Sequence, residues 1–111
     1  MTIVTYKWND VSNQAMSRES IGRRHEPAAK YRISPCTFDH QRRIVGVTRA
    51  GTLYVESGVC HFTMSGQCVV LRENCVAEFP DGDYVLELVS PGELRVIYVW
   101  EIPEFEKTSK R

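Results

Sequence analysis

Apolar side chains recur at every second position along most of the chain from about residue 31 onward. This spacing is typical of β-strands with one buried face, because successive side chains of a strand point to opposite faces of a sheet. The pattern is clearest at the C-terminal end, where Arg95 and Glu101 occupy the opposite parity. The alternating apolar positions include Tyr31 and Ile33, Val45 and Val47, Leu53 and Val55, Cys75, Ala77 and Phe79, Tyr84, Leu86 and Leu88, and Leu94, Val96, Tyr98 and Trp100.

Turn signals separate these short segments. Each contains a glycine, which tolerates positive φ, or a proline, which fixes φ. They are Ser34-Pro35, Ala50-Gly51, Ser57-Gly58, Ser65-Gly66, Pro80-Asp81-Gly82 and Ser90-Pro91-Gly92. About eight strands at this interval predict an all-β fold, either a β-sandwich or a barrel of short antiparallel strands.

The N-terminal region follows a different pattern. Residues 3–8 predict an edge strand, and Ser12 is a suitable N-cap for a helix of about two turns through residues 14–16, which Gly22 would end. Residues 18–30 are mostly polar, so we expect a loop that lies on the sandwich. We therefore predict a single domain over residues 1–111, with an N-terminal strand and polar loop (1–30), a β-barrel (31–103) and a charged, frayed tail (104–111).

Length and charge exclude several classes of protein. The 111 residues suffice for one hydrophobic core. No apolar run approaches the roughly 18 residues of a membrane span, and no signal segment follows Met1, so we expect a cytoplasmic protein with no membrane partner. The 14 basic and 14 acidic residues cancel, which argues against a nucleic-acid partner because such binding requires an excess of Lys and Arg.

The charges are divided unevenly along the chain. Residues 1–55 carry nine basic and four acidic residues, a balance of +5, whereas residues 56–111 carry five basic and ten acidic residues, a balance of −5. In one interpretation the two halves interleave in one fold and the charges cancel locally. In the other, a basic patch receives an anionic ligand or the acidic face of a second subunit. This patch would consist of Arg18, Arg23, Arg24, Lys30 and Arg32.

The four cysteines form no CxxC pair. We expect reduced, buried thiols that pack as small hydrophobic groups. A zinc site built from Cys36, Cys60 and His61 is an alternative that nothing in the spacing requires. The sequence also contains no nucleophile elbow, P-loop or dinucleotide-binding glycine cluster.

Between Cys36 and Val89, about half of the chain, the sequence resembles the cupin superfamily. Gly51 stands where the first cupin motif closes, just before a predicted strand. Pro80-Asp81-Gly82 matches the Pro-x-Gly of the second motif and is followed by another predicted strand. The resemblance implies a small jelly-roll barrel, whose relatives hold a metal ion inside on three histidines and one glutamate.

Most of the positions that correspond to these metal ligands hold other residues. Counting from the two motif glycines places Phe38 and His40 at two of the histidines, Ile44 at the glutamate and Val85 at the third histidine. One imidazole alone does not hold a divalent ion against water. We therefore expect a metal-free, largely apolar cavity with no cofactor.

These observations predict a cupin-like binding protein. It would hold an unidentified small molecule, apolar or weakly anionic, in the barrel, or a protein partner at a sheet edge. The resemblance implies a homodimer, and the division of charge is an independent reason to expect one. The candidate ligand-binding residues are Phe38, His40, Ile44, Val85, Tyr98 and Arg32.

The alternative function is catalytic. Some proteins of the family that the sequence resembles are metal-independent isomerases, epimerases or lyases that act on sugars or sugar nucleotides. If this chain is such an enzyme, we expect His40 to act as the base and Tyr98 as the acid. Both residues also have structural interpretations, His40 as a partly solvated residue at a strand end and Tyr98 as part of the core. His25 and His61 are expected to be solvated or at a strand edge. A sensor or interaction module is a third possibility.

Overall fold

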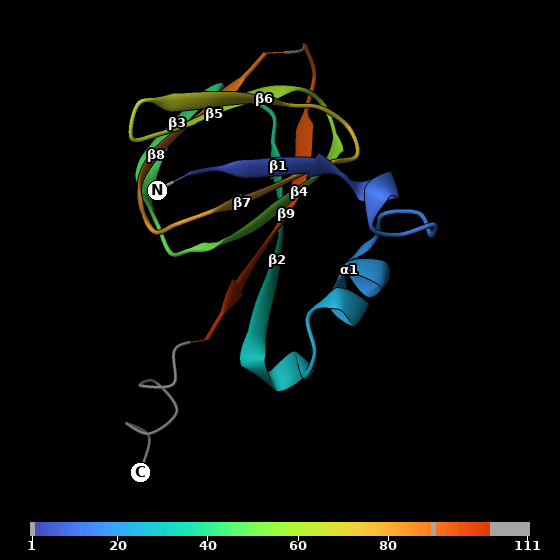
Figure 1. Ribbon diagram of the computed structural model, residues 1–111. Helices are drawn as coiled ribbons and strands as arrows, with labels where there is room; N and C mark the ends of the chain where they lie inside the picture. The colour runs from blue at the N-terminus through green and yellow to red at the C-terminus, as the bar shows by residue number, and fades with distance from the viewer. Residues whose placement is uncertain (1, 90, 103–111) are drawn as a thin grey trace.

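The computed structural model describes residues 2–89 and 91–102, and these form two antiparallel β-sheets that face each other (Figure 1). The predicted all-β fold is confirmed. The nine strands within these ranges are β1 (Val4–Lys7), β2 (Tyr31–Phe38), β3 (Arg43–Thr48), β4 (Gly51–Ser57), β5 (Cys60–Met64), β6 (Gln67–Leu71), β7 (Cys75–Phe79), β8 (Gly82–Leu88) and β9 (Leu94–Glu101). The helical segments are η1 (Trp8–Asp10), α1 (Arg18–Arg24) and η2 (Ala28–Lys30).

The strand order is β1-β7-β4-β9-β2 in one sheet and β3-β8-β5-β6 in the other. The inner faces of the two sheets pack together and form the main core. Its buried side chains alternate along the strands, because each strand turns one parity inward. They include Leu53, Val55, Cys60, Phe62, Met64, Leu71, Ala77, Phe79, Leu86, Leu94 and Val96. Two predicted apolar pairs face outward instead: Tyr31 and Ile33 lie on the outer face of β2, and Val45 and Val47 are exposed on β3.

The two sides of the barrel differ in how the sheet edges meet. On one side Gln67 of β6 joins the residue before β1, accepting from the Ile3 N–H at 2.9 Å and donating to the Ile3 carbonyl at 3.2 Å. On the other side the edges are β2 and β3. In the described part of the chain, β2 pairs only with β9 and β3 only with β8.

Helix α1 lies beside the five-stranded sheet (Figure 1). A second apolar cluster, which includes Ile21 of α1, lies on the outer face of this sheet. Its buried members are Trp8, Ile21, Tyr54, Val76, Ile97 and Val99. Consequently β4, β7 and β9 are apolar on both faces where α1 and η1 cover them. The alternation in the sequence predicted only the inner of these two faces.

The predicted N-terminal helix is wrong in position. The helix begins after Ser17, not Ser12, because the Ser17 hydroxyl accepts the Ser20 N–H at 3.1 Å and the Ser20 hydroxyl accepts the Ser17 N–H at 2.9 Å. Ile21 then anchors the helix in the second cluster. Gly22 lies inside the helix and does not end it. The loop predicted for residues 18–30 is therefore helical at residues 18–24, although it lies on the sandwich as expected.

Both sheets contain strands from both halves of the chain, so the charged halves interleave. Within the described residues, Lys30 pairs with Glu101 at 3.2 Å and Arg43 with Glu87 at 3.5 Å, and each of these ion pairs joins the two halves. The predicted tail at residues 104–111, and residue 103, lie outside the described residues. The longest helix in the described ranges has seven residues, far fewer than a membrane-spanning helix requires.

Candidate functional site

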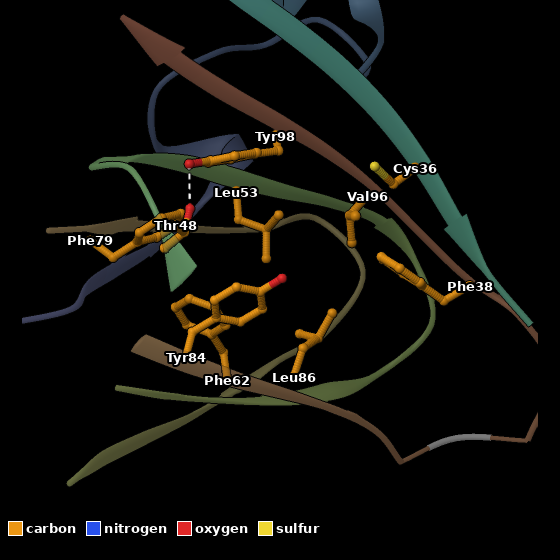
Figure 2. A pocket seen from close by; sticks show the side chains of 10 residues that line it. All are labelled: Cys36, Phe38, Thr48, Leu53, Phe62, Phe79, Tyr84, Leu86, Val96 and Tyr98. Atoms are coloured by element: carbon orange, nitrogen blue, oxygen red, sulfur yellow. Dashed lines mark hydrogen bonds between the residues drawn. The ribbon is translucent and has the colours of Figure 1, made fainter. Parts of the chain in front are cut away.

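A cavity of about 110 Å³ lies between the two sheets (Figure 2). Its wall is aromatic and aliphatic except for three hydroxyl groups and one thiol. The lining residues are Cys36 and Phe38 from β2, Thr48 from β3, Leu53 from β4, Phe62 from β5, Phe79 from β7, Tyr84 and Leu86 from β8, and Val96 and Tyr98 from β9.

Aromatic rings in mutual contact form a large part of this wall. Phe62 lies between Phe79 and Tyr84, with ring centroids 5.0 and 5.9 Å away. Phe79 stacks on Tyr98 at 5.7 Å, and Tyr98 contacts Trp100 at 4.7 Å. Such contacts fix ring positions at little entropic cost, so the cavity has a preformed aromatic surface.

Two glycines make room for these rings. A Cβ atom on Gly51 would lie 2.5 Å from the Val99 carbonyl oxygen and 2.7 Å from the Tyr98 ring, so a larger residue would force β9 or the ring to shift. Gly46 of β3 pairs with Tyr84 of β8, and a Cβ atom on it would lie 3.3 Å from the tyrosine ring. The missing side chain at Gly46 allows the Tyr84 ring to lie over β3.

The Tyr98 hydroxyl links the two sheets on the side where β2 and β3 are edges. It donates to the Arg49 carbonyl at 2.8 Å and hydrogen-bonds with the Thr48 hydroxyl (Figure 2). Burial raises the pKa of Tyr98, and the hydrogen bond with the Thr48 hydroxyl opposes this shift. The hydroxyl therefore stays protonated, and its proton is engaged in holding the ring in place.

The Tyr84 hydroxyl is the polar group left for a ligand. It points into the cavity (Figure 2). None of the described residues hydrogen-bonds to it. Buried side-chain nitrogen and oxygen atoms in these ranges all have partners, so the Tyr84 oxygen is accessible rather than sealed. A molecule in the cavity can donate a hydrogen bond to it or accept one from it.

Of the predicted site residues, Phe38 and Tyr98 line the cavity. Ile44 packs against the main core from β3 but does not reach the lining. His40 is exposed in the bend after β2, and Arg32 is exposed on β2 opposite Trp100. The structure therefore does not bring His40 and Tyr98 together at the cavity, and the catalytic pair considered above is not assembled there.

The predicted inward orientation of Val85 is wrong. Val85 pairs with Val45, and both line a shallow depression on the outer face of the four-stranded sheet. Its neighbours Tyr84 and Leu86 point inward instead. Counting from Gly82 placed the motif one residue out of step with the strand, and a shift of one residue exchanges the two faces. The alternation of Tyr84, Leu86 and Leu88 in the sequence carried the correct parity.

The lining does not fit the metal site that the cupin fold implies. It offers one thiol and three hydroxyls, without an imidazole or a carboxylate. Nowhere in residues 2–89 and 91–102 do three or more His, Cys, Asp or Glu side chains gather in a way that suits a metal ion. The metal-free character of the barrel stays a prediction, which elemental analysis of the purified protein tests.

The cysteines occupy unlike environments. Cys36 is half-buried at the cavity, Cys75 is half-buried, Cys60 is buried and Cys68 is exposed. All four are free thiols. The expectation of buried thiols is wrong for Cys68, which lies on the outer face of β6 next to the turn.

Comparison with solved structures identifies the fold. The cupin domain of Cnp3 from Schizosaccharomyces pombe is 11% identical, with a TM-score of 0.59 over 78% of this chain and 64% of that chain. A cupin superfamily protein from Desulfitobacterium hafniense is 14% identical, with a TM-score of 0.56 over 92% of this chain and 79% of that one. The EutQ protein of Clostridium difficile is 14% identical, with a TM-score of 0.56 over 91% and 68% of the two chains.

No protein-family model matches the sequence, and no curated protein gives a significant match. At these identities the structural likeness shows the fold alone, because one fold supports many functions. The chain has the cupin fold, as the resemblance predicted, and what its barrel does has to be argued from the cavity.

Proposed function

We propose that this cupin-fold chain is a metal-independent binding protein that holds one small, neutral molecule of about the size of a single aromatic ring. The observation that carries this proposal is the aromatic cavity with one accessible hydroxyl, that of Tyr84. The lining contains no basic side chain, so an apolar occupant is favoured over an anionic one.

The volume limits the occupant. Drug-sized ligands occupy pockets of about 300–1,000 Å³, and an apolar cavity of about 150 Å³ accepts benzene. The cavity of about 110 Å³ is smaller than this but is partly open, so the buried part of an occupant is limited to one ring or a short aliphatic chain. Because Cys36 and Tyr84 are only half-buried, a substituent on that ring has a route to the surface.

Thermal-shift and calorimetric titration with phenol and toluene tests the proposal. Both probes are expected to raise the melting temperature, since a ligand that binds only the folded state stabilises it. Cys36→Phe fills the cavity and is expected to abolish binding. Cys68→Phe, on the outer face, is the matched control and leaves binding intact. Failure of both probes to bind the wild-type protein, or equal binding by Cys36→Phe, contradicts the proposal.

Tyr84→Phe tests the role assigned to the free hydroxyl. One hydrogen bond contributes about 0.5–1.5 kcal/mol, so phenol is expected to bind about twofold to twelvefold more weakly to the variant. Toluene forms no such bond, and its affinity is expected to change little. Equal losses for the two probes would show that Tyr84 acts only through packing.

A second candidate function is association with a protein partner, in the first instance a second copy of the chain. It is favoured by β3, an edge strand whose outward side chains Val45 and Val47 are 62% and 77% exposed. Exposed apolar edge strands are prone to pair with other strands unless charge or proline blocks them.

A further inference from the structure

A polar cluster lies on the outer face of the five-stranded sheet, away from the barrel cavity. Its centre is the buried hydroxyl of Tyr54, 3.1 Å from Arg24 Nη1 and 2.8 Å from His25 Nε2. Next to it the Tyr6 hydroxyl donates to Glu78 at 2.7 Å. Arg24 and His25 stand at the C-terminal end of α1, so this cluster joins the helix to β4 beneath it.

The hydrogen bonds at Tyr54 constrain the protonation state of His25. A guanidinium group only donates, so Arg24 supplies a proton to the Tyr54 oxygen. The Tyr54 proton is then free to go to His25 Nε2, provided that this nitrogen is unprotonated. With a neutral His25 that carries its proton on Nδ1, each hydrogen bond at the Tyr54 oxygen joins one donor to one acceptor.

Protonation of His25 breaks this arrangement. Two cationic donors would face the Tyr54 oxygen, and the Tyr54 proton would lose its acceptor. The Tyr54 ring is enclosed by the second apolar cluster and meets the Trp8 ring at 5.8 Å, so this side offers the hydroxyl no other acceptor. A buried hydroxyl without a partner and two adjacent positive charges both carry a free-energy cost.

The charges around the imidazole act in the same direction. Burial lowers the pKa of His25, the Arg24 charge lowers it further, and Glu78 on β7 partly opposes them. Tyr31 on β2 faces the ring edge-on at 5.0 Å. Burial raises the pKa of Tyr54 to about 12, so Tyr54 keeps its proton throughout the physiological range, as does Tyr6, whose pKa is raised by burial and by Glu78.

We infer that His25 is a pH-sensitive latch, which in its neutral form holds α1 against the sheet and on protonation releases it. Because the folded state favours the neutral imidazole, the contribution of His25 to stability is present above the ordinary pKa of 6.5. It is lost as the pH falls below that value. The Leu53 side chain, on the opposite face of β4, lines the cavity, so the latch acts on a strand that forms the cavity wall. The inference does not rest on the proposed ligand.

The fluorescence of Trp8 reports on the latch. The chain has two tryptophans, so Trp100→Phe leaves Trp8, which is buried beside Tyr54, as the only one. Between about pH 8 and about pH 5 its emission is expected to shift to the red along a single-proton titration curve. His25→Gln keeps a hydrogen-bond acceptor but cannot titrate, so in this variant the Trp8 emission is expected not to change with pH. His40→Gln, at an exposed position, is the matched control and is expected to keep the pH-dependent shift.

A titration curve that survives in His25→Gln, or a flat response in the Trp100→Phe protein, overturns the inference. Proton NMR of the wild-type protein tests the same inference without a His25 variant. The His25 ring is expected to titrate at a lower pH than an ordinary histidine, and the amide signals of residues 18–25 are expected to follow the same curve. Amide signals that do not move with the His25 ring would equally overturn the latch.

Discussion

At the scale of single residues, Gly51 controls the position of the aromatic wall. It pairs with Phe79 on one side and Trp100 on the other, so it sits between two of the strands that supply rings. The Val99 carbonyl and the Tyr98 ring approach the position that a side chain would occupy. The need for glycine there arises from the backbone of another strand, not from a turn.

Gly51→Ala is therefore expected to destabilise the protein by about 1–3 kcal/mol, the usual cost of overpacking a core. Urea denaturation measures the difference. Gly22→Ala is the control, because a Cβ atom there meets only Ile33 Cδ1, at 3.8 Å, and alanine favours the helix by up to about 1 kcal/mol. A Gly51→Ala protein as stable as the wild type would contradict the packing described for this strand.

The thiols provide a second prediction at this scale. Burial, with a smaller contribution from nearby Cys75, raises the pKa of Cys60 to about 12. The thiolate fraction of Cys60 is then about one in ten thousand at pH 8, and the sulfur is also sealed from reagents. Cys68 is exposed.

An aromatic disulfide reagent should label Cys68 fast, and Cys68→Ser should remove that fast phase. Folded Cys60 should stay unlabelled while Cys68 reacts. Fast labelling of Cys60 would contradict its burial.

Only part of the site was predictable from single residues. Tyr98 lines the cavity as expected, because it lies on the inward parity of β9, whose alternation is clear. Phe38 also lines the cavity, but only the count from Gly51 placed it there, since the alternating Tyr31 and Ile33 of the same strand face the outer cluster. Val85 does not line the cavity, since the motif count fixed its position along the strand without fixing the face. Tyr84 was missed for the same reason, although its parity was visible in the sequence. His25 was expected to be solvated, because its acceptor role depends on Tyr54, 29 residues away.

At the scale of elements, the strands were predictable and the helix was not. Nearest-neighbour alternation defines a strand locally, whereas a helix of seven residues depends on the surface it covers. The apolar residue that anchors α1, Ile21, has no periodic partner within the helix. It packs instead against side chains from β4, β7 and β9, which the sequence alone does not bring together.

The N-cap gives the element-scale prediction. Ser17→Ala removes the hydroxyl that accepts the Ser20 N–H and is expected to cost about 1 kcal/mol. Ser12→Ala, at the position that the sequence favoured as the cap, removes only a contact with the Gln14 N–H at 3.1 Å and is expected to cost less than about 0.5 kcal/mol. Urea denaturation of both variants measures the costs. The reverse order would place the start of the helix at Ser12.

At the scale of the whole molecule, the charged halves of the chain are joined inside one fold, so their opposite signs do not by themselves require a second subunit. Three of the five residues in the predicted basic patch have partners within the fold. Arg23 pairs with Glu19 at 2.9 Å, Lys30 pairs with Glu101, and Arg24 donates to Tyr54. Exposed ion pairs contribute at most about 1 kcal/mol each. Self-association, if driven by a surface of this molecule, is better explained by apolar side chains than by charge.

The edge strand β3 carries those side chains, and this gives the last prediction. Pairing of two β3 strands would cover Val45 and Val47 and satisfy the unpaired backbone groups of both edges. Sedimentation analysis of the wild-type protein is expected to show a dimer, and Val47→Lys a monomer, because lysine on an edge strand opposes pairing. Val4→Lys is the matched control, since Val4 is 52% exposed on β1, an edge of the other sheet, and it is expected to leave the dimer intact. A monomeric wild-type protein, or a dimeric Val47→Lys, excludes association through β3.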